Sequence, residues 1–147
     1  MNRSEREAFL AEAHVGLIAI SEPGRGPLCV PIWYGYEPGG EVWIVTERGS
    51  RKGRLLRQGE RISVCAQTEA PPYKYVSVEG PITSIAPSDL EAHERVLAHR
   101  YLGPEQGDQY IEATGGESRG DNVLVRMRPE RWLSVDYAKQ FPGISLG

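Results

Sequence analysis

Seven short segments have the length and composition of β-strands, and no helical pattern alternates with them as a parallel sheet requires. They are rich in β-branched and aromatic residues or alternate apolar with polar positions, and turns with Gly or Pro separate several of them. These segments are residues 15–20, 28–36, 42–46, 61–67, 74–85, 122–127 and 130–137. The pattern predicts a mainly β fold with peripheral helices, in which an antiparallel sheet forms a Greek-key barrel.

Length and composition predict one compact domain, residues 1–147, because the chain contains no internal repeat. A chain of this size buries roughly two thirds of its unfolded surface without disulfides or metals. Cys29 and Cys65 stand in apolar strand-like runs, so we expect two reduced, buried thiols in a cytoplasmic protein. No apolar run approaches the ~20 residues of a membrane helix. The net charge of -3 argues against a general nucleic-acid binder.

Positive charge is concentrated in the stretch that follows the third strand. Residues 48–61 carry six cations against one carboxylate, Glu60, so this stretch has a net charge of +5. Ser50 is a good helix N-cap, and the unpaired N–H groups of the next turn would point outward beside Arg51 and Lys52. Such a corner attracts phosphate. The alternative is a solvated basic helix that only keeps the protein soluble.

Conventional catalytic patterns are missing from the sequence. His93 and His99 lie six residues apart, not at the three- or four-residue spacing that puts two metal ligands on one helical face, so we expect no metal site. There is no nucleophile elbow, no phosphate-binding loop of the nucleotide hydrolases and no dinucleotide fingerprint. The remaining chemistry is that of a bound redox cofactor, which the protein positions.

Helix starts are predicted by two capping-box spacings. Ser4 and Glu7 have this spacing in an N-terminal helix, and Ser88 and Glu91 repeat it. Residues 89–121 carry a net charge of -5 and are expected to form one or two surface helices. We expect a flexible loop at residues 115–122, and the last ten residues show no periodicity.

Turn residues predict how the strands connect. The turn at residues 37–40 predicts a hairpin that makes the second and third strands antiparallel neighbours. Gly80-Pro81 predicts a bend in the long fifth strand. Pro31 inside the second strand favours an edge position, because proline gives no hydrogen bond to a neighbouring strand. An edge strand of this kind leaves one side open to a flat ligand.

Similarity to a known family extends over residues 9–85. TERGSRK, residues 46–52, resembles that family's phosphate-binding corner, and CVPIWYGY with EVWIVT, residues 29–36 and 41–46, resembles its second and third strands. RISVCAQ and YKYVSVEGPITSI, residues 61–67 and 73–85, resemble the next pair. The family is that of the FMN- and deazaflavin-binding split barrels related to pyridoxamine 5'-phosphate oxidase. The resemblance implies a split barrel that forms a homodimer with its cofactor at the subunit interface.

The resemblance also implies which residues contact the cofactor. The flavin-type ring would lie along the second strand, the third strand would flank the ribityl chain and phosphate, and the cationic corner would hold the phosphate. Tyr75, and less surely Lys74, would reach the cofactor from the second subunit. The implied cofactor-binding residues are Val30, Pro31, Ile32, Trp33, Val45, Thr46, Ser50, Arg51, Lys52 and Tyr75. No catalytic side chain is assigned.

Two departures separate this chain from the FMN oxidases of the family. Cys29 stands where those enzymes usually carry a basic residue, and no Arg-containing substrate motif follows Trp132. The PIWY sequence, the short chain and the extra Arg54 and Arg57 are more similar to the deazaflavin branch found in actinobacteria. Its coenzyme, F420, carries a longer anionic tail. The resemblance therefore implies an F420-dependent oxidoreductase that moves a hydride between the deazaflavin and a small unsaturated or quinone-like molecule.

Two other functions stay open at this point. An FMN-binding oxidoreductase would share the fold and most of the contacts. A non-catalytic protein that binds a tetrapyrrole or a phosphorylated ligand would also use such a barrel. Single-stranded nucleic acid is disfavoured because the chain is acidic and its positive charge is confined to one stretch.

Overall fold

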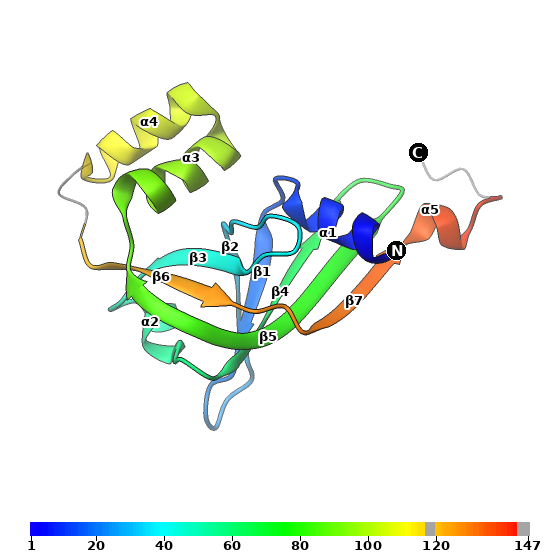
Figure 1. Ribbon diagram of the computed structural model, residues 1–147, viewed down its shortest axis with the longest axis horizontal. Coiled ribbons are helices and arrows are strands. Elements are labelled where there is room, and N and C mark those ends of the chain that lie inside the picture. Colours follow the sequence, from blue (N-terminus) through cyan, green and yellow to red (C-terminus); the bar gives the residue numbers. More distant parts are fainter. Residues whose placement is uncertain (117–119, 144–147) are drawn as a thin grey trace.

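A computed structural model describes residues 1–116 and 120–143 and shows a curled antiparallel sheet with peripheral helices (Figure 1). The strands are β1 Gly16–Ile20, β2 Leu28–Ile32, β3 Val42–Glu47, β4 Arg61–Gln67, β5 Lys74–Pro87, β6 Asn122–Met127 and β7 Arg131–Asp136. The helices are α1 Arg3–Ala11, α2 Arg51–Leu55, the π-helical turn η1 Leu90–Glu94, α3 Arg95–Leu102, α4 Pro104–Ala113 and α5 Tyr137–Gln140. This architecture confirms the predicted mainly β split barrel.

The long strand β5 joins the two parts of the sheet. The strand order is β2-β1-β4-β5-β6-β3, and β7 also pairs with β5. The first half of β5 lies between β4 and β7, and its second half pairs with β6. A register shift between Ile82 and Ser84 lies just beyond the bend predicted at Gly80-Pro81. Because such a shift bends a strand, the sheet curls around its core.

The sheet does not close: among the described strands, its path of paired strands ends at β2 and at β3, and β7, which pairs only with β5, is a further edge. In the described part of the chain, the only ladder contact recorded between the neighbouring segments of β2 and β3 is an isolated bridge. In that bridge the Gly35 N–H donates to the Trp43 carbonyl at 2.8 Å, and the Trp43 N–H donates to the Gly35 carbonyl at 3.0 Å. A Cβ on Gly35 would lie 2.0 Å from the Trp43 ring, so only glycine fits there. The seam between β2 and β3 is therefore pinned at one end and open elsewhere.

The hairpin predicted between the second and third strands is confirmed only beside its turn, where Gly35 and Trp43 form one antiparallel bridge. β2 ends at Ile32, and it pairs with β1, whereas β3 pairs with β6. The backbone of Tyr34 is instead engaged by α3: the Tyr101 hydroxyl lies 3.2 Å from both its N–H and its carbonyl oxygen. The same hydroxyl donates to the carbonyl of His14 at 2.7 Å. Tyr101 lies 67 residues from Tyr34 in the sequence, and its hydroxyl takes the place of the hairpin ladder at Tyr34.

The core lies inside the curl and is built from alternating strand positions. Burial alternates along β1, β3 and β4, so one side chain in two points inward. Each buried aliphatic side chain contributes about 1.5–3 kcal/mol by leaving water. Phe9 and Leu10 of α1 are buried in the same cluster, which fixes α1 against the sheet (Figure 1).

Both predicted capping boxes are misplaced, whereas the cap at Ser50 is correct. Asn2, not Ser4, caps α1 by accepting a hydrogen bond from the Glu5 N–H at 2.9 Å. Asp89, not Ser88, caps η1 by accepting from the Ala92 N–H at 2.7 Å. Asn and Asp are as good as Ser at this position, so the spacing alone did not choose between neighbours.

The thiols are free, but they are not buried as predicted. Cys29 is exposed and Cys65 is half-buried, because both occupy the strand positions that point away from the core. The acidic region contains two surface helices, α3 and α4, as expected. Part of the predicted flexible loop, residues 117–119, lies outside the described residues, as do residues 144–147 of the tail. Over the ranges 1–116 and 120–143, no helix has both the length and the apolar character to cross a membrane.

Candidate functional site

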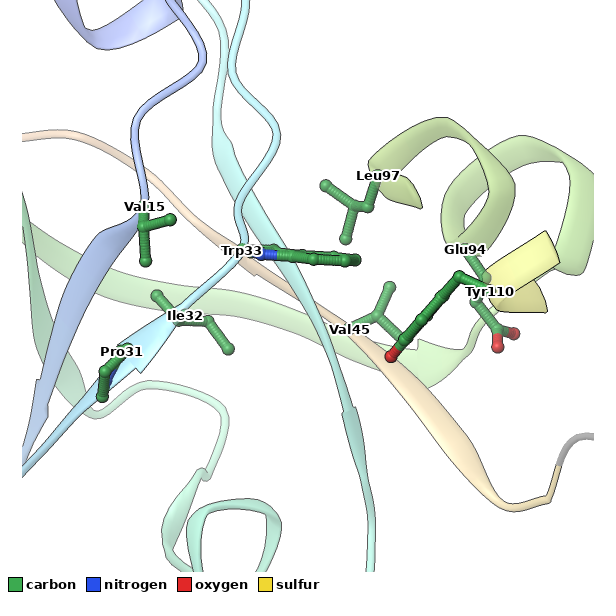
Figure 2. Close-up of a pocket in the computed structure, with 8 residues that line it drawn as sticks. All are labelled: Val15, Pro31, Ile32, Trp33, Val45, Glu94, Leu97 and Tyr110. Carbon is green, nitrogen blue, oxygen red and sulfur yellow. The ribbon is translucent and has the colours of Figure 1, made fainter. Parts of the chain in front are cut away.

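Two hollows lie along the open seam and share Pro31 of β2. The first, about 520 Å³, is lined by Leu28, Val30, Pro31, Thr46, Glu47, Ser50, Arg51 and Lys52. The second, about 270 Å³, is lined by Val15, Pro31, Ile32, Trp33, Val45, Glu94, Leu97 and Tyr110 (Figure 2). We call them the cationic hollow and the aromatic hollow. A ligand that lies along the seam can occupy both.

The cationic hollow is shaped by the start of α2. The Ser50 hydroxyl accepts from the Gly53 N–H at 3.0 Å and donates to the Glu47 carbonyl at 2.7 Å. The Thr46 hydroxyl lies 3.3 Å from it. A Cβ on Gly53 would lie 2.1 Å from the Glu47 carbonyl oxygen, so this glycine lets the helix turn pack directly on the end of β3. Local sequence thus places Arg51 and Lys52 at the hollow.

Lys52 is the cation best placed to receive an anion. Its side chain is half-buried, and this burial lowers the pKa of its ammonium group. No ion pair or side-chain hydrogen bond is recorded for it with any residue that the structure describes. A charged group that has lost water without gaining a partner is unfavourable, and an anion in the hollow would compensate for that loss.

Arg51 has a partner that the sequence did not predict. Its guanidinium donates to the Glu22 carboxylate at 2.5 Å, and this hydrogen bond lowers the pKa of Glu22. Glu22 lies in the turn between β1 and β2, 29 residues away, so no local pattern indicated it. An arriving phosphate must share the Arg51 fork with this carboxylate or displace it.

The remaining cations of residues 48–61 do not line the cationic hollow. Arg48 pairs with Asp121 at 3.6 Å, and Arg61 pairs with Glu79 and Glu130 at 3.0 and 2.6 Å. Arg54 and Arg57 are exposed. The local charge of +5 is therefore partly neutralised by distant carboxylates, and two cations of the six face the site.

The aromatic hollow is walled by β2 on one side and by the α3–α4 pair on the other. The Trp33 ring stacks on Tyr101 at 5.1 Å, with 9° between the planes, and Tyr110 lies 5.3 Å from it at 53°. Figure 2 shows the Trp33 ring extending into the hollow, with Leu97 on one side and Val45 on the other. These surfaces suit a flat, apolar group.

Among the residues that the structure describes, Glu94 is the one charged residue that lines the aromatic hollow. Its carboxylate is buried and accepts hydrogen bonds from the Ser88 hydroxyl at 2.9 Å and from the Asn122 amide at 2.8 Å. Glu94 and Leu97 are three residues apart and so share a helix face. Sequence patterns did not indicate Glu94, Leu97 or Tyr110 as residues of the site, because these residues reach the seam only through the docking of α3 and α4. Val15, which was also missed, directly precedes β1 and lies beside β2 through the pairing of these two strands.

Nine of the ten residues assigned from the resemblance lie at the seam. Six line the cationic hollow: Val30, Pro31, Thr46, Ser50, Arg51 and Lys52. Pro31 also belongs to the aromatic hollow, together with Ile32, Trp33 and Val45. Tyr75 lines neither hollow; it stands in β5, opposite Gln67 of β4 and Val135 of β7. Lys74, beside it, lies 3.9 Å from Asp136.

Comparison with known proteins identifies the family of this chain. A family model described as pyridoxamine 5'-phosphate oxidase matches residues 2–132, most of the chain. The chain belongs to the pyridoxamine 5'-phosphate oxidase family. Membership places it among oxidoreductases with the flavin-binding split-barrel fold. No curated protein matches it closely enough to assign an activity.

Solved structures with the same fold include proteins of several kinds. A conserved hypothetical protein, Rv2991, from Mycobacterium tuberculosis is 26% identical, with a TM-score of 0.77 over 100% of this chain and 92% of that one. An F420 reductase is 20% identical, with a TM-score of 0.68 over 86% of this chain and 94% of its own. An FAD-binding protein from Mesorhizobium loti is 20% identical, with a TM-score of 0.61 over 91% and 93%. The last two similarities concern the fold.

We predict that Lys52→Met stabilises the unliganded protein. Burial lowers the pKa of Lys52 in the folded state below its value in the unfolded chain. At a pH between these two pKa values, Lys52 is protonated in the unfolded chain and has lost its proton in the folded protein. Stability contributed by this group therefore rises with pH across that window. Urea unfolding at neutral pH should give a higher free energy for Lys52→Met, with a flatter alkaline pH dependence. Arg57→Met, which removes an exposed cation, is the control and should leave the stability unchanged. A Lys52→Met variant that is no more stable than the wild-type protein would contradict the prediction.

Proposed function

We propose that this protein is an F420-dependent oxidoreductase whose cofactor lies along the seam between β2 and β3. One observation supports the proposal: the cationic hollow, which contains Arg51 and Lys52, and the aromatic hollow, which is lined by aromatic and aliphatic side chains, share Pro31. A phosphorylated arm fits the first, and a flat ring fits the second. When bound, the deazaflavin supplies the hydride chemistry. The residues of the chain bind it, orient it and exclude water.

FMN is the second candidate cofactor, and one observation favours it. Arg54 and Arg57, the two extra arginines that resemble the deazaflavin branch, are not among the lining residues of the cationic hollow. A cationic hollow with two facing cations matches a single terminal phosphate. In favour of F420 are the PIWY sequence and the F420 reductase among the structural neighbours.

Replacing Arg51 and Lys52 together by Ala should weaken binding of either cofactor by about 100-fold or more, because each charged hydrogen bond contributes about 1.5–3 kcal/mol. Titration with F420 and with FMN, followed by tryptophan fluorescence, measures this loss. The matched control removes the same charge outside the hollow, as the double change of Arg54 and Arg57 to Ala. Unaltered cofactor affinity in a folded Arg51/Lys52 variant would rule out the proposed site. If the Arg54/Arg57 variant binds F420 more weakly but binds FMN as tightly as the wild type does, F420 is favoured as the cofactor.

The substrate that we propose is a flat, uncharged acceptor such as a quinone, which would stack against the cofactor ring at the mouth of the aromatic hollow. The described residues that line this hollow include no cation, and their one carboxylate is already hydrogen-bonded by Ser88 and Asn122. A negatively charged acceptor would lose hydration there and gain no opposite charge. Tyr110, on α4, is the lining residue farthest along the chain and is partly exposed. We assign it to the mouth of the hollow, where an acceptor would enter, because it is both a lining residue and 39% exposed.

Tyr110→Ala should raise KM for 1,4-naphthoquinone about 3- to 10-fold, since an aromatic contact contributes about 0.5–1.5 kcal/mol. Cofactor affinity should fall much less than in the Arg51/Lys52 double variant, because the phosphate contacts of the cationic hollow stay intact. Steady-state kinetics with the reduced cofactor measures KM, and Phe141→Ala removes an exposed aromatic side chain elsewhere as the control. If 1,4-naphthoquinone-2-sulfonate reacts as well as the neutral quinone, the apolar substrate assignment is wrong. Cofactor binding without turnover of any acceptor would instead favour a storage or carrier role.

We also propose a homodimer in which the second subunit covers the outer face of the sheet. Strand register aligns Pro31, Leu17, Cys65, Ser77 and Leu133 across this face. Leu17 and Leu133 are 38% and 62% exposed, and Tyr75 belongs to the same face. Exposed apolar side chains that are contiguous with Pro31 favour a partner that also reaches the cofactor.

Leu133→Arg should convert the dimer to a monomer, because a charge replaces an exposed apolar side chain within the proposed interface. Light scattering after size-exclusion chromatography gives the mass, and cofactor titration should show weaker binding in the monomer. Val96→Arg is the control, since Val96 is 45% exposed on α3. A wild-type protein that is monomeric at micromolar concentration would disprove the dimer without affecting the hollows themselves.

A further inference from the structure

A third hollow lies away from the seam, between α1, the loop that joins β2 to β3, and the turn that joins β6 to β7. Its volume is about 360 Å³, within the range of roughly 300–1,000 Å³ that is usual for small-molecule sites. It shares no lining residue with the cationic or the aromatic hollow. Arg3, Arg6 and Arg128 line it together with Tyr36 and Trp132. No function assigned above uses it.

Arg6 is the central charged group of this hollow. Its guanidinium carbon lies 4.8 Å from the centre of the Trp132 ring, which holds the planar group in one orientation. Its Nε is buried and has no hydrogen-bond partner among the described residues, and no ion pair is recorded for the side chain there. A guanidinium that is stacked and incompletely hydrogen-bonded is prepared to receive an acceptor group.

Two further guanidinium groups stand at the rim. Arg3 pairs with Glu7 at 3.2 Å and Arg128 with Glu130 at 3.0 Å, and the two arginine side chains are 78% and 60% exposed. Exposed pairs of this kind are weak, so either arginine can turn toward a ligand at little cost. Glu7 and Glu41 also line the hollow, and Glu41 accepts a hydrogen bond from the Thr83 hydroxyl, so three arginines face two carboxylates. The balance of charge favours an anion.

Aromatic rings form another part of the lining. The Tyr36 and Trp132 rings lie 6.2 Å apart at 53°, and Tyr36 is almost fully buried. Burial raises the pKa of the Tyr36 phenol, so its hydroxyl remains protonated and can donate a hydrogen bond. Flat walls beside a stacked guanidinium suit a conjugated group better than a saturated one.

We propose that this hollow is a second binding site, for a small organic anion whose carboxylate or phosphate faces Arg6 and whose flat body lies against Trp132 and Tyr36. The rim arginines Arg3 and Arg128 complete the contact with the anionic group. The site is independent of the cofactor, because the two sets of lining residues do not overlap. It therefore accepts its ligand whether or not the seam is filled.

The test is an NMR titration of the full-length protein with benzoate and, separately, with phenyl phosphate. The three tryptophans give three indole N–H signals, and Trp132→Phe assigns the one from this site. Either probe should shift the Trp132 signal saturably, and the tighter of the two tells whether the site prefers a carboxylate or a phosphate. Arg6→Gln should weaken binding about tenfold or more, and Arg128→Gln several-fold.

Arg131→Gln is the matched control, because Arg131 is next to Trp132 in β7 and its side chain points to the opposite face of the strand. Should Arg6→Gln fail to fold, Arg128→Gln at the exposed rim still decides the matter. The proposal is overturned if Trp132 shows no saturable shift, or if Arg128→Gln binds as tightly as Arg131→Gln. Equal binding of cyclohexanecarboxylate and benzoate would overturn the assignment of a flat ligand.

Discussion

The rest of the structure depends on the hydrogen bonding of β5, which pairs with three other strands along its length. Its first half holds β4 and β7, and beyond the register shift near Ile82 it holds β6, which in turn carries β3. This change of partner curls the sheet far enough to bring its edge strands β2 and β3 face to face. Because the curl stops short of closure, backbone hydrogen bonds do not fill the seam, and side chains from both edges line a cleft. The cofactor and substrate sites that we propose are products of this incomplete closure.

Electrostatics around the seam follow from the same curvature. Summed along the sequence, residues 48–61 form a strongly basic segment, yet the fold brings Glu22, Asp121, Glu79 and Glu130 to its arginines. Charge counted over a window of sequence therefore overstates the positive field at the site. Lys52 differs because it is half-buried in the cationic hollow, so its charge lacks both full hydration and a recorded ionic partner in the described residues. One partly desolvated ammonium determines more of the anion preference than several neutralised arginines.

Local patterns predicted the strands well, because the alternation of apolar and polar residues in the sequence matches the alternation of buried and exposed positions in a strand. They also predicted the cap at Ser50, where a good N-cap residue stands between a strand and a short helix. The predicted hairpin extends no further than the Gly35–Trp43 bridge, and the backbone of Tyr34 bonds instead to Tyr101, which lies in a helix far along the chain. The same limit applies to the site. Residues within one strand–turn–helix unit could be assigned, whereas Glu94, Leu97 and Tyr110 reach the seam only through the docking of α3 and α4.

Pro31 also bears on how two copies of this chain can meet. It stands in β2, at an edge of the sheet, and proline has no N–H to offer to a further strand. An exposed edge with a complete row of donors would be a template on which another polypeptide could extend the sheet. The missing donor interrupts that row beside the cleft. Growth of an open-ended fibre by backbone pairing along β2 is thereby disfavoured, and the face of the sheet, where side chains give specificity, is left for the homodimer that we propose.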